Sequence, residues 1–176
     1  PYADLEQSVR SLMAELCNET CGQCTACCCR ADICEEARES AFLARLLERQ
    51  GIAAGGMDDR YGWLEEHGCA LAFGRPPVCH AFFCNDLLTH FPEEESRLAL
   101  RALGGLIDEV GRNALGNWHL VEIMDPEDLG QLDADGLLER LADAQDAFGI
   151  IEQFWQTGEL DEADRPTLQT YARHQG

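Results

Sequence analysis

The feature that most constrains this chain is the grouping of its ten cysteines. Seven of them lie between Cys17 and Cys34, three lie between Cys69 and Cys84, and none follows. A secreted disulfide scaffold would also use many cysteines, but such scaffolds are usually short and poor in apolar core. Three cysteines in direct succession, at positions 27–29, would also rarely present separate well-aimed disulfide partners. We therefore expect the cysteines to bind metal in the reducing environment of the cytoplasm.

The spacing within the first group favours one kind of metal site. Its central run places cysteines two residues apart and ends in an adjacent pair: Cys21, Cys24, Cys27 and Cys28. Zinc sites are typically built from two separated C-x2-C pairs, whereas successive x2 spacings are typical of the bacterial ferredoxin run that holds a cuboidal cluster. Ala31 stands where that run would have its next cysteine. A fourth ligand would then be Cys28 or, from the second group, Cys79.

The sequence therefore predicts an iron–sulfur cluster, with [4Fe–4S] favoured and zinc as the alternative. Eight cysteines are the candidate metal ligands: Cys17, Cys21, Cys24, Cys27, Cys28, Cys69, Cys79 and Cys84. This number exceeds the needs of one tetrahedral site, so two sites or one polynuclear site are open alternatives. His80 leaves a mixed site open, and Cys29 and Cys34 are equally well explained as small, partly buried residues. Arg30 and Arg75 flank the two loops and could offset the charge of the thiolates, or form ordinary surface ion pairs.

These motifs resemble a known family. The segment CGQCTACC followed by GCALAFGRPPVC is similar to the YkgJ or CxxCxxCC family of zinc- or iron-chelating domains. The matching elements are the four-cysteine run, Cys69, the Arg75-Pro76 pair, Cys79 and Cys84, within residues 17–84. The resemblance implies a chelated metal. A related cysteine domain occurs in a flagellin lysine methylase, so a metal-dependent enzyme similar to a protein methyltransferase is a further alternative.

Apolar spacing predicts a mainly α-helical fold with two irregular cysteine-rich loops joined around a metal site. The expected helices are residues 4–17, 35–50, 58–67, 86–89, 92–115 and 135–155. We expect a loop over 17–34, an extended or looped segment over 68–84, a short strand over 118–124 and a polar tail after 155. The chain is interpreted as one domain, 1–176, with a cysteine-rich part (17–84) and an acidic helical part (85–176).

Charge and motif content exclude several function classes. The chain has 13 basic residues against 33 acidic ones, for a net charge of −20, which disfavours nucleic acid and anionic membranes and favours a redox or basic protein partner. All the basic residues are arginine, so lysine chemistry is excluded. No nucleotide fingerprint or nucleophile elbow occurs, and His119 is better explained as a satisfied, half-buried side chain than as a base. The segment 132–136 predicts helix capping by Asp133 or Asp135 rather than a calcium loop.

The sequence has no basic, apolar leader and no long apolar run, so we expect a cytoplasmic protein without membrane spans. It also contains no catalytic motif that would indicate an enzyme.

Overall fold

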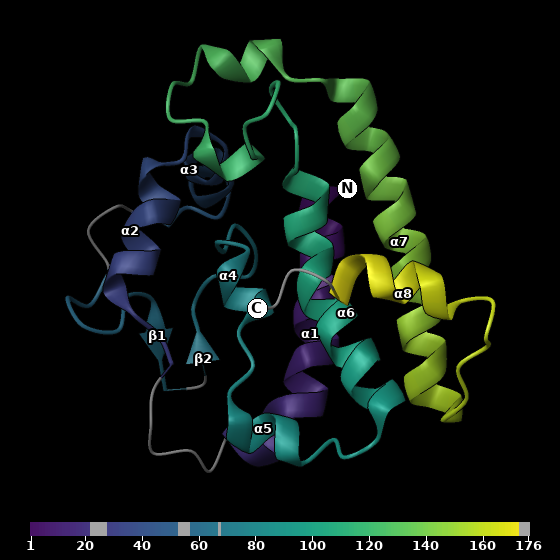
Figure 1. The fold of residues 1–176 in the computed structure, drawn as a ribbon. Helices are drawn as coiled ribbons and strands as arrows, with labels where there is room; N and C mark the ends of the chain where they lie inside the picture. The colour runs from purple at the N-terminus through teal and green to yellow at the C-terminus, as the bar shows by residue number, and fades with distance from the viewer. Residues whose placement is uncertain (22–27, 53–56, 67, 173–176) are drawn as a thin grey trace. The chain divides into compact units, whose positions relative to one another are not determined.

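A computed structural model describes residues 1–21, 28–52, 57–66 and 68–172 (Figure 1). The fold is mainly α-helical, as predicted, and the only sheet in the described part of the chain has two strands. The chain forms two compact units, each built from separate stretches of sequence. Unit 1 comprises residues 1–24, 77–110 and 137–176, and unit 2 comprises residues 25–76 and 111–136.

Unit 1 is a set of packed helices. Its elements are α1 (Tyr2–Cys21), α4 (Val78–Ala81), α5 (Asn85–Thr89), α6 (Glu94–Gly111), α7 (Ala134–Thr157) and α8 (Arg165–Ala172). Helix α6 buries Leu103, Leu106, Ile107 and Val110 completely, at spacings of three and four that place them on one face. Burying a leucine or isoleucine side chain stabilises a fold by about 1.5–3 kcal/mol, so this face is a main source of stability in unit 1.

Helices α6 and α8 approach each other closely through a glycine. A Cβ atom added to Gly105 on α6 would lie 2.0 Å from the backbone oxygen of Tyr171 on α8. A second contact joins α8 to α6 at the other end of α8, where the Arg165 guanidinium donates a hydrogen bond to the Glu95 carboxylate at 2.6 Å. The absence of a side chain at Gly105 is what lets the two backbones meet.

Unit 2 contains shorter elements. They are α2 (Ala31–Glu39), α3 (Ala41–Arg49), β1 (Leu64–Glu65), β2 (Gly68–Cys69) and the 3-10 turns η1 (Leu120–Glu122) and η2 (Asp128–Gln131). The Gln50 side chain fixes the segment that follows β2, because its amide oxygen accepts from the Ala72 N–H and its amide nitrogen donates to the Phe73 carbonyl, at 2.9 and 2.8 Å. Strands β1 and β2 are antiparallel, with Leu64 opposite Cys69.

The helix expected over 35–50 is two helices that meet at Ser40, and the first begins earlier, at Ala31. Ser40 has an extended backbone, with ψ of 119°, and its hydroxyl accepts from the Leu43 N–H at 3.3 Å. A serine in this N-cap position starts a new helix. The apolar spacing continues across Ser40, so it predicted a single helix where the structure has two.

The helix expected over 58–67 is wrong within the described residues. Asp58 pairs with Gly62 in an isolated bridge, and Leu64–Glu65 is strand β1. The Asp58 carboxylate accepts the backbone N–H groups of Arg60 and Tyr61, at 2.9 and 2.8 Å, and Gly62 has φ of 64°. These side chain to backbone bonds give the segment an alternative to a helix, and the positive φ ends helical geometry.

Four further expectations need correction. The segment 118–124 holds η1 instead of a strand, because the His119 ring nitrogen accepts from Val121 and Glu122 bonds back to the His119 N–H. The segment 68–84, expected to be extended or looped, contains the short helix α4, which begins directly after Pro77. The polar tail after 155 contains α8, whose Leu168 is completely buried. The helices expected near 4–17, 86–89, 92–115 and 135–155 are confirmed as α1, α5, α6 and α7. The loop expected over 17–34 is wrong at both ends, because α1 continues to Cys21 and α2 begins at Ala31.

Candidate metal centre

Unit 1 gathers three of the predicted ligands from distant parts of the chain. Cys17 and Cys21 lie one helical turn apart on α1, and Cys84 directly precedes α5, which packs against α1 (Figure 1). The pKa of Cys17 is raised to about 12, mainly by burial and in addition by the negative charge of the Cys21 and Cys84 thiolates. Cys17 and Cys84, which are 67 residues apart in the sequence (84 − 17), therefore lie within electrostatic range of each other.

Local hydrogen bonding fixes the position of Cys84. Its sulfur accepts the backbone N–H of Leu87 at 3.4 Å, so the thiol occupies the N-cap position of α5. Leu87 itself is buried.

Cys79 and His80 have different surroundings on the short helix α4. Cys79 is exposed, whereas His80 is only 1% exposed and its Nε2 lies 3.3 Å from Oε1 of Glu6, which is completely buried. His80 is thus already part of a buried pair that joins α4 to α1. To serve in a mixed cysteine–histidine site, its Nε2 would have to leave Glu6. The sequence carried a signal for this partner, because Glu6 stands with Tyr2, Leu5 and Val9 on the buried face of α1.

In unit 2, Cys34 and Cys69 lie near each other. Burial raises the pKa of Cys34, and the charge of Cys69 raises it further, while a backbone hydrogen bond from Trp63 lowers it. Cys34 also packs on Gly62, where an added Cβ atom would lie 2.2 Å from the Cys34 sulfur. This packing agrees with the interpretation of Cys34 as a half-buried structural residue. Cys28 is exposed and Cys29 is half-buried.

Cys24 and Cys27 lie outside the described residues. Within the described ranges, no three side chains of His, Cys, Asp or Glu are grouped so as to hold a metal ion. We predicted that the loops over 17–28 and 69–84 join around one metal. Each of these loops has residues in both compact units, and the joining stays a prediction.

The two arginines that flank the cysteine loops make the following contacts, and for Arg30 the contact is the surface ion pair that was one of the two expectations. Arg30 forms an ion pair with Asp32, and both side chains are mostly exposed, so this pair contributes little to stability. Arg75 donates to the carbonyl oxygens of Leu71 and Cys69, at 2.9 and 3.4 Å. Arg75 thus holds the backbone of the loop that carries Cys69.

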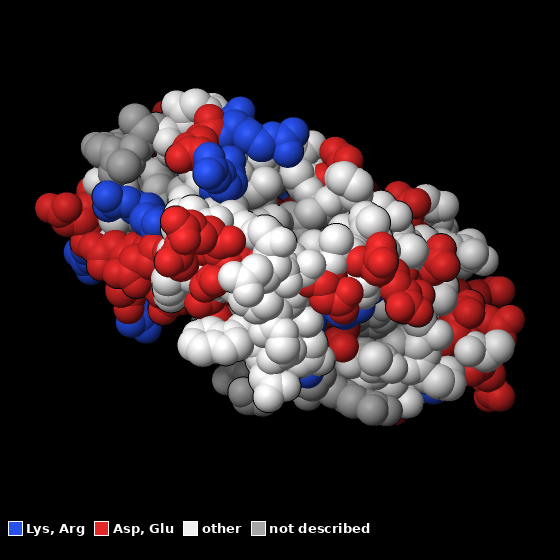
Figure 2. All heavy atoms as spheres, turned by 90° about the horizontal axis from the view of Figure 1, so that it is seen from above, with Lys and Arg blue, Asp and Glu red and all other residues white. Residues whose placement is uncertain are grey.

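Two expectations about individual side chains are confirmed. The half-buried His119 is satisfied by its backbone contact with Val121. The Asp133 carboxylate accepts the Gly136 N–H at 3.1 Å, which is the capping predicted for 132–136. Figure 2 shows acidic side chains spread over the face that it presents, with most of the visible arginine atoms grouped toward the upper left.

Comparison with known proteins supplies no family. No family model matches the chain, and neither a curated protein nor a solved structure is significantly similar to it. A search of the described helices finds none that combines the length and the apolar character of a membrane span.

Proposed function

We propose that this chain is a cysteine-rich metal-binding protein that holds an iron–sulfur cluster for electron transfer, redox sensing or structural support. The observation that supports the proposal is that Cys21 and Cys84 both lie within electrostatic range of Cys17 in unit 1. Three thiols of one kind in one place repel one another when ionised, and a bound cation or cluster removes that repulsion. Thiolates are the ligands that iron–sulfur clusters and zinc prefer.

Zinc is the second candidate, and one feature of α1 favours it. Cys17 and Cys21 are separated by three residues within a regular helix, a spacing that falls inside the range used by zinc ligand pairs. A structural zinc would staple α1 to the start of α5 without any redox chemistry. The two candidates differ in inorganic sulfide, because a zinc site contains none.

The deciding experiment is the iron, zinc and acid-labile sulfide content of protein purified without oxygen, with its visible spectrum. A [4Fe–4S] cluster gives about four irons and four sulfides per chain and broad absorption near about 400 nm, bleached by dithionite. One or two zincs without sulfide would contradict the cluster and select the zinc alternative. Protein that takes up neither metal on reconstitution would contradict both.

Matched cysteine variants test which thiols hold the metal. We expect Cys84→Ser to lose most of the bound metal, because it removes the one thiol of the gathered three that comes from outside α1. Cys34→Ala is the control, since Cys34 is the half-buried thiol that packs on Gly62 in the other unit. Equal metal loss in the two variants would contradict the assignment to unit 1.

A further inference from the structure

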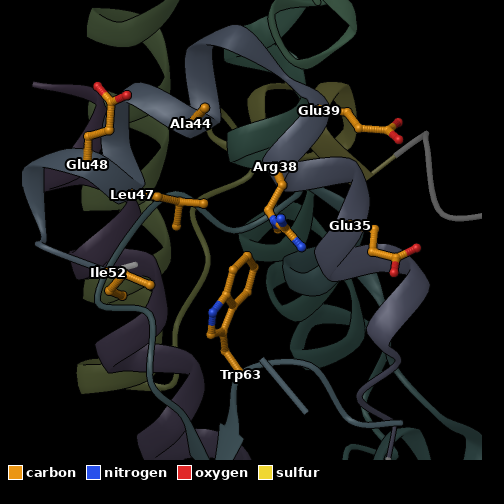
Figure 3. Close-up of a pocket in the computed structure, with 8 residues that line it drawn as sticks. All are labelled: Glu35, Arg38, Glu39, Ala44, Leu47, Glu48, Ile52 and Trp63. Carbon is orange, nitrogen blue, oxygen red and sulfur yellow. The ribbon is translucent and has the colours of Figure 1, made fainter. Parts of the chain in front are cut away.

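Unit 2 contains a pocket that the proposed metal function does not use. Its volume is about 470 Å³, and residues of α2 and α3 line it together with Ile52 and Trp63 (Figure 3). This size is within the range of about 300–1,000 Å³ that is typical of small-molecule sites. None of the cysteines in the described part of the chain is among its lining residues.

The pocket contains a buried hydrogen-bond donor without an acceptor. Trp63 is only 4% exposed, and its indole Nε1 has no hydrogen-bond partner among the described residues. In Figure 3 the nitrogen lies on the edge of the ring that faces Ile52 and Leu47. The backbone of Trp63 is anchored, because its carbonyl accepts from the Ala70 N–H at 2.8 Å. An unpaired buried N–H costs about 1–3 kcal/mol, which a ligand with an acceptor group would recover.

A second donor in the pocket is cationic. The Arg38 side chain extends from α2 toward the Trp63 ring (Figure 3), and it forms no ion pair with any described residue. A guanidinium has only donors, arranged as a fork that matches a carboxylate. Arg38 and Trp63 together therefore select a ligand with acceptor oxygens and negative charge.

The remaining lining residues limit that ligand. Three glutamates, Glu35, Glu39 and Glu48, are at the pocket, but their carboxylates point away from the Trp63 ring in Figure 3. The Glu48 carboxylate is paired with Arg45 at 3.4 Å. Their charge still repels a second negative group on the ligand, within the screening distance of about 8 Å at physiological salt.

We infer that this pocket binds a small organic monocarboxylate with an apolar body. The carboxylate pairs with the Arg38 guanidinium through one oxygen and accepts the Trp63 indole N–H through the other, because the apolar body of the ligand has no acceptor. The apolar body lies against Leu47 and Ile52. A cationic ligand does not fit this arrangement, because both inward-facing polar groups are donors and one of them is positively charged.

The test compares three probes that share one apolar body: octanoate, octan-1-ol and octylamine. Binding is followed through the indole N–H resonance of Trp63 in the NMR spectrum of the full chain, assigned with Trp63→Phe. We expect octanoate to shift this resonance saturably and octan-1-ol to bind at least about tenfold more weakly, since it lacks the charge-assisted pair. Octylamine is expected to leave the resonance unchanged.

Variants of two exposed arginines separate recognition from general charge. Arg38→Gln should weaken octanoate binding by about tenfold or more. Arg49→Gln makes the same change of charge in the same unit, at a position that does not line the pocket, and should leave the affinity unchanged. Far-ultraviolet circular dichroism verifies that both variants are folded.

Four results would overturn the inference. They are no saturable shift with octanoate, equal affinity for octanoate and octan-1-ol, displacement of octanoate by octylamine at the Trp63 resonance, and equal loss of affinity in Arg38→Gln and Arg49→Gln. The metal content of the protein does not enter any of these outcomes, so the inference stands or fails independently of the proposed metal function.

Discussion

At the scale of single residues, the thiols of unit 1 differ in how readily they can become metal ligands. The pKa of Cys17 is raised to about 12, mainly by burial, whereas Cys21 and Cys79 are exposed. A metal binds the thiolate, so binding at Cys17 must displace a proton that the folded, metal-free protein holds tightly. Metal affinity should therefore increase with pH across the neutral and mildly alkaline range.

The protonation of Cys17 leads to a prediction about reactivity. In reduced, metal-free, folded protein, we expect iodoacetamide to modify Cys17 at least about tenfold more slowly than in the unfolded chain, because only the thiolate reacts. Its rate should still be rising with pH above 9.0, the ordinary thiol value, and should level off only near about 12. Mass spectrometry of peptides after timed alkylation measures both quantities, and circular dichroism verifies the folded state. A folded-state rate that levels off near 9.0 would contradict the raised pKa.

The same shift fixes the sign of a contribution to stability. Below pH 9.0 the Cys17 thiol is protonated in both the folded and the unfolded chain, and its buried neutral form is fully compatible with the fold. Above that pH the unfolded chain loses the proton first, so unfolding is favoured as the pH rises toward about 12. The metal-free protein should thus lose stability on the alkaline side.

Residue spacing predicts which thiols can share a metal but not how each is buried. The repeated x2 spacing marked Cys21 and its successors as candidate ligands without any structure. The burial of Cys17 depends on what packs around the end of α1, and α5, which packs against it, begins more than sixty residues later. The pairing of Glu6 with His80 is hidden for the same reason, since the two residues are 74 positions apart.

At the scale of elements, two glycines in the helices of unit 1 have opposite roles. Gly105 on α6 faces the backbone of α8, whereas Gly149 on α7 is exposed, and a Cβ atom added there would have no atom within 4 Å. Glycine in a helix costs about 0.5–1 kcal/mol relative to alanine through its backbone entropy. At Gly105 the close approach of two helices offsets that cost, and at Gly149 nothing does.

We therefore predict opposite effects for two identical substitutions. Gly105→Ala should lower the free energy of unfolding by about 1–3 kcal/mol, because the Tyr171 backbone oxygen cannot move aside as a side chain could. Gly149→Ala should raise it by about 0.5–1 kcal/mol. Urea denaturation of both variants measures the two changes under one set of conditions. Equal stabilisation in both would mean that α8 does not pack on α6 as described.

The elements themselves were predictable where helical periodicity is long and uninterrupted. Helices α1, α6 and α7 each present a regular buried stripe, and each was expected at nearly its observed position. The predicted helix boundaries are wrong where a short polar side chain accepts hydrogen bonds from nearby backbone N–H groups, as Asp58 and Ser40 do. Periodicity does not register such local hydrogen bonds, which decide whether a turn continues into a helix.

At the scale of the whole molecule, the net charge of −20 is the dominant electrostatic fact. The many acidic side chains on the face shown in Figure 2 agree with this net charge. The net charge itself follows from the amino-acid composition alone. Its consequence is self-repulsion in the folded state, where carboxylates are held closer together than in an expanded chain. A pocket of unit 1 illustrates this, because Asp4, Glu15 and Glu152 line it and none of its described lining residues is basic.

The last prediction concerns salt. Raising the ionic strength from about 10 mM to about 150 mM shortens the screening distance from about 30 Å to about 8 Å, so the melting temperature should rise. Each kcal/mol of repulsion that is relieved should raise the melting temperature of a chain of this length by roughly 2–4 °C.

The double variant Glu15→Gln/Glu152→Gln, with two fewer negative charges, should melt at a higher temperature at low salt, and its melting temperature should rise less when salt is added. Arg49→Gln, which adds net negative charge, should do the reverse. Differential scanning calorimetry at matched metal content measures all three proteins, and a melting temperature that falls with salt would show that specific ion pairs outweigh the general repulsion.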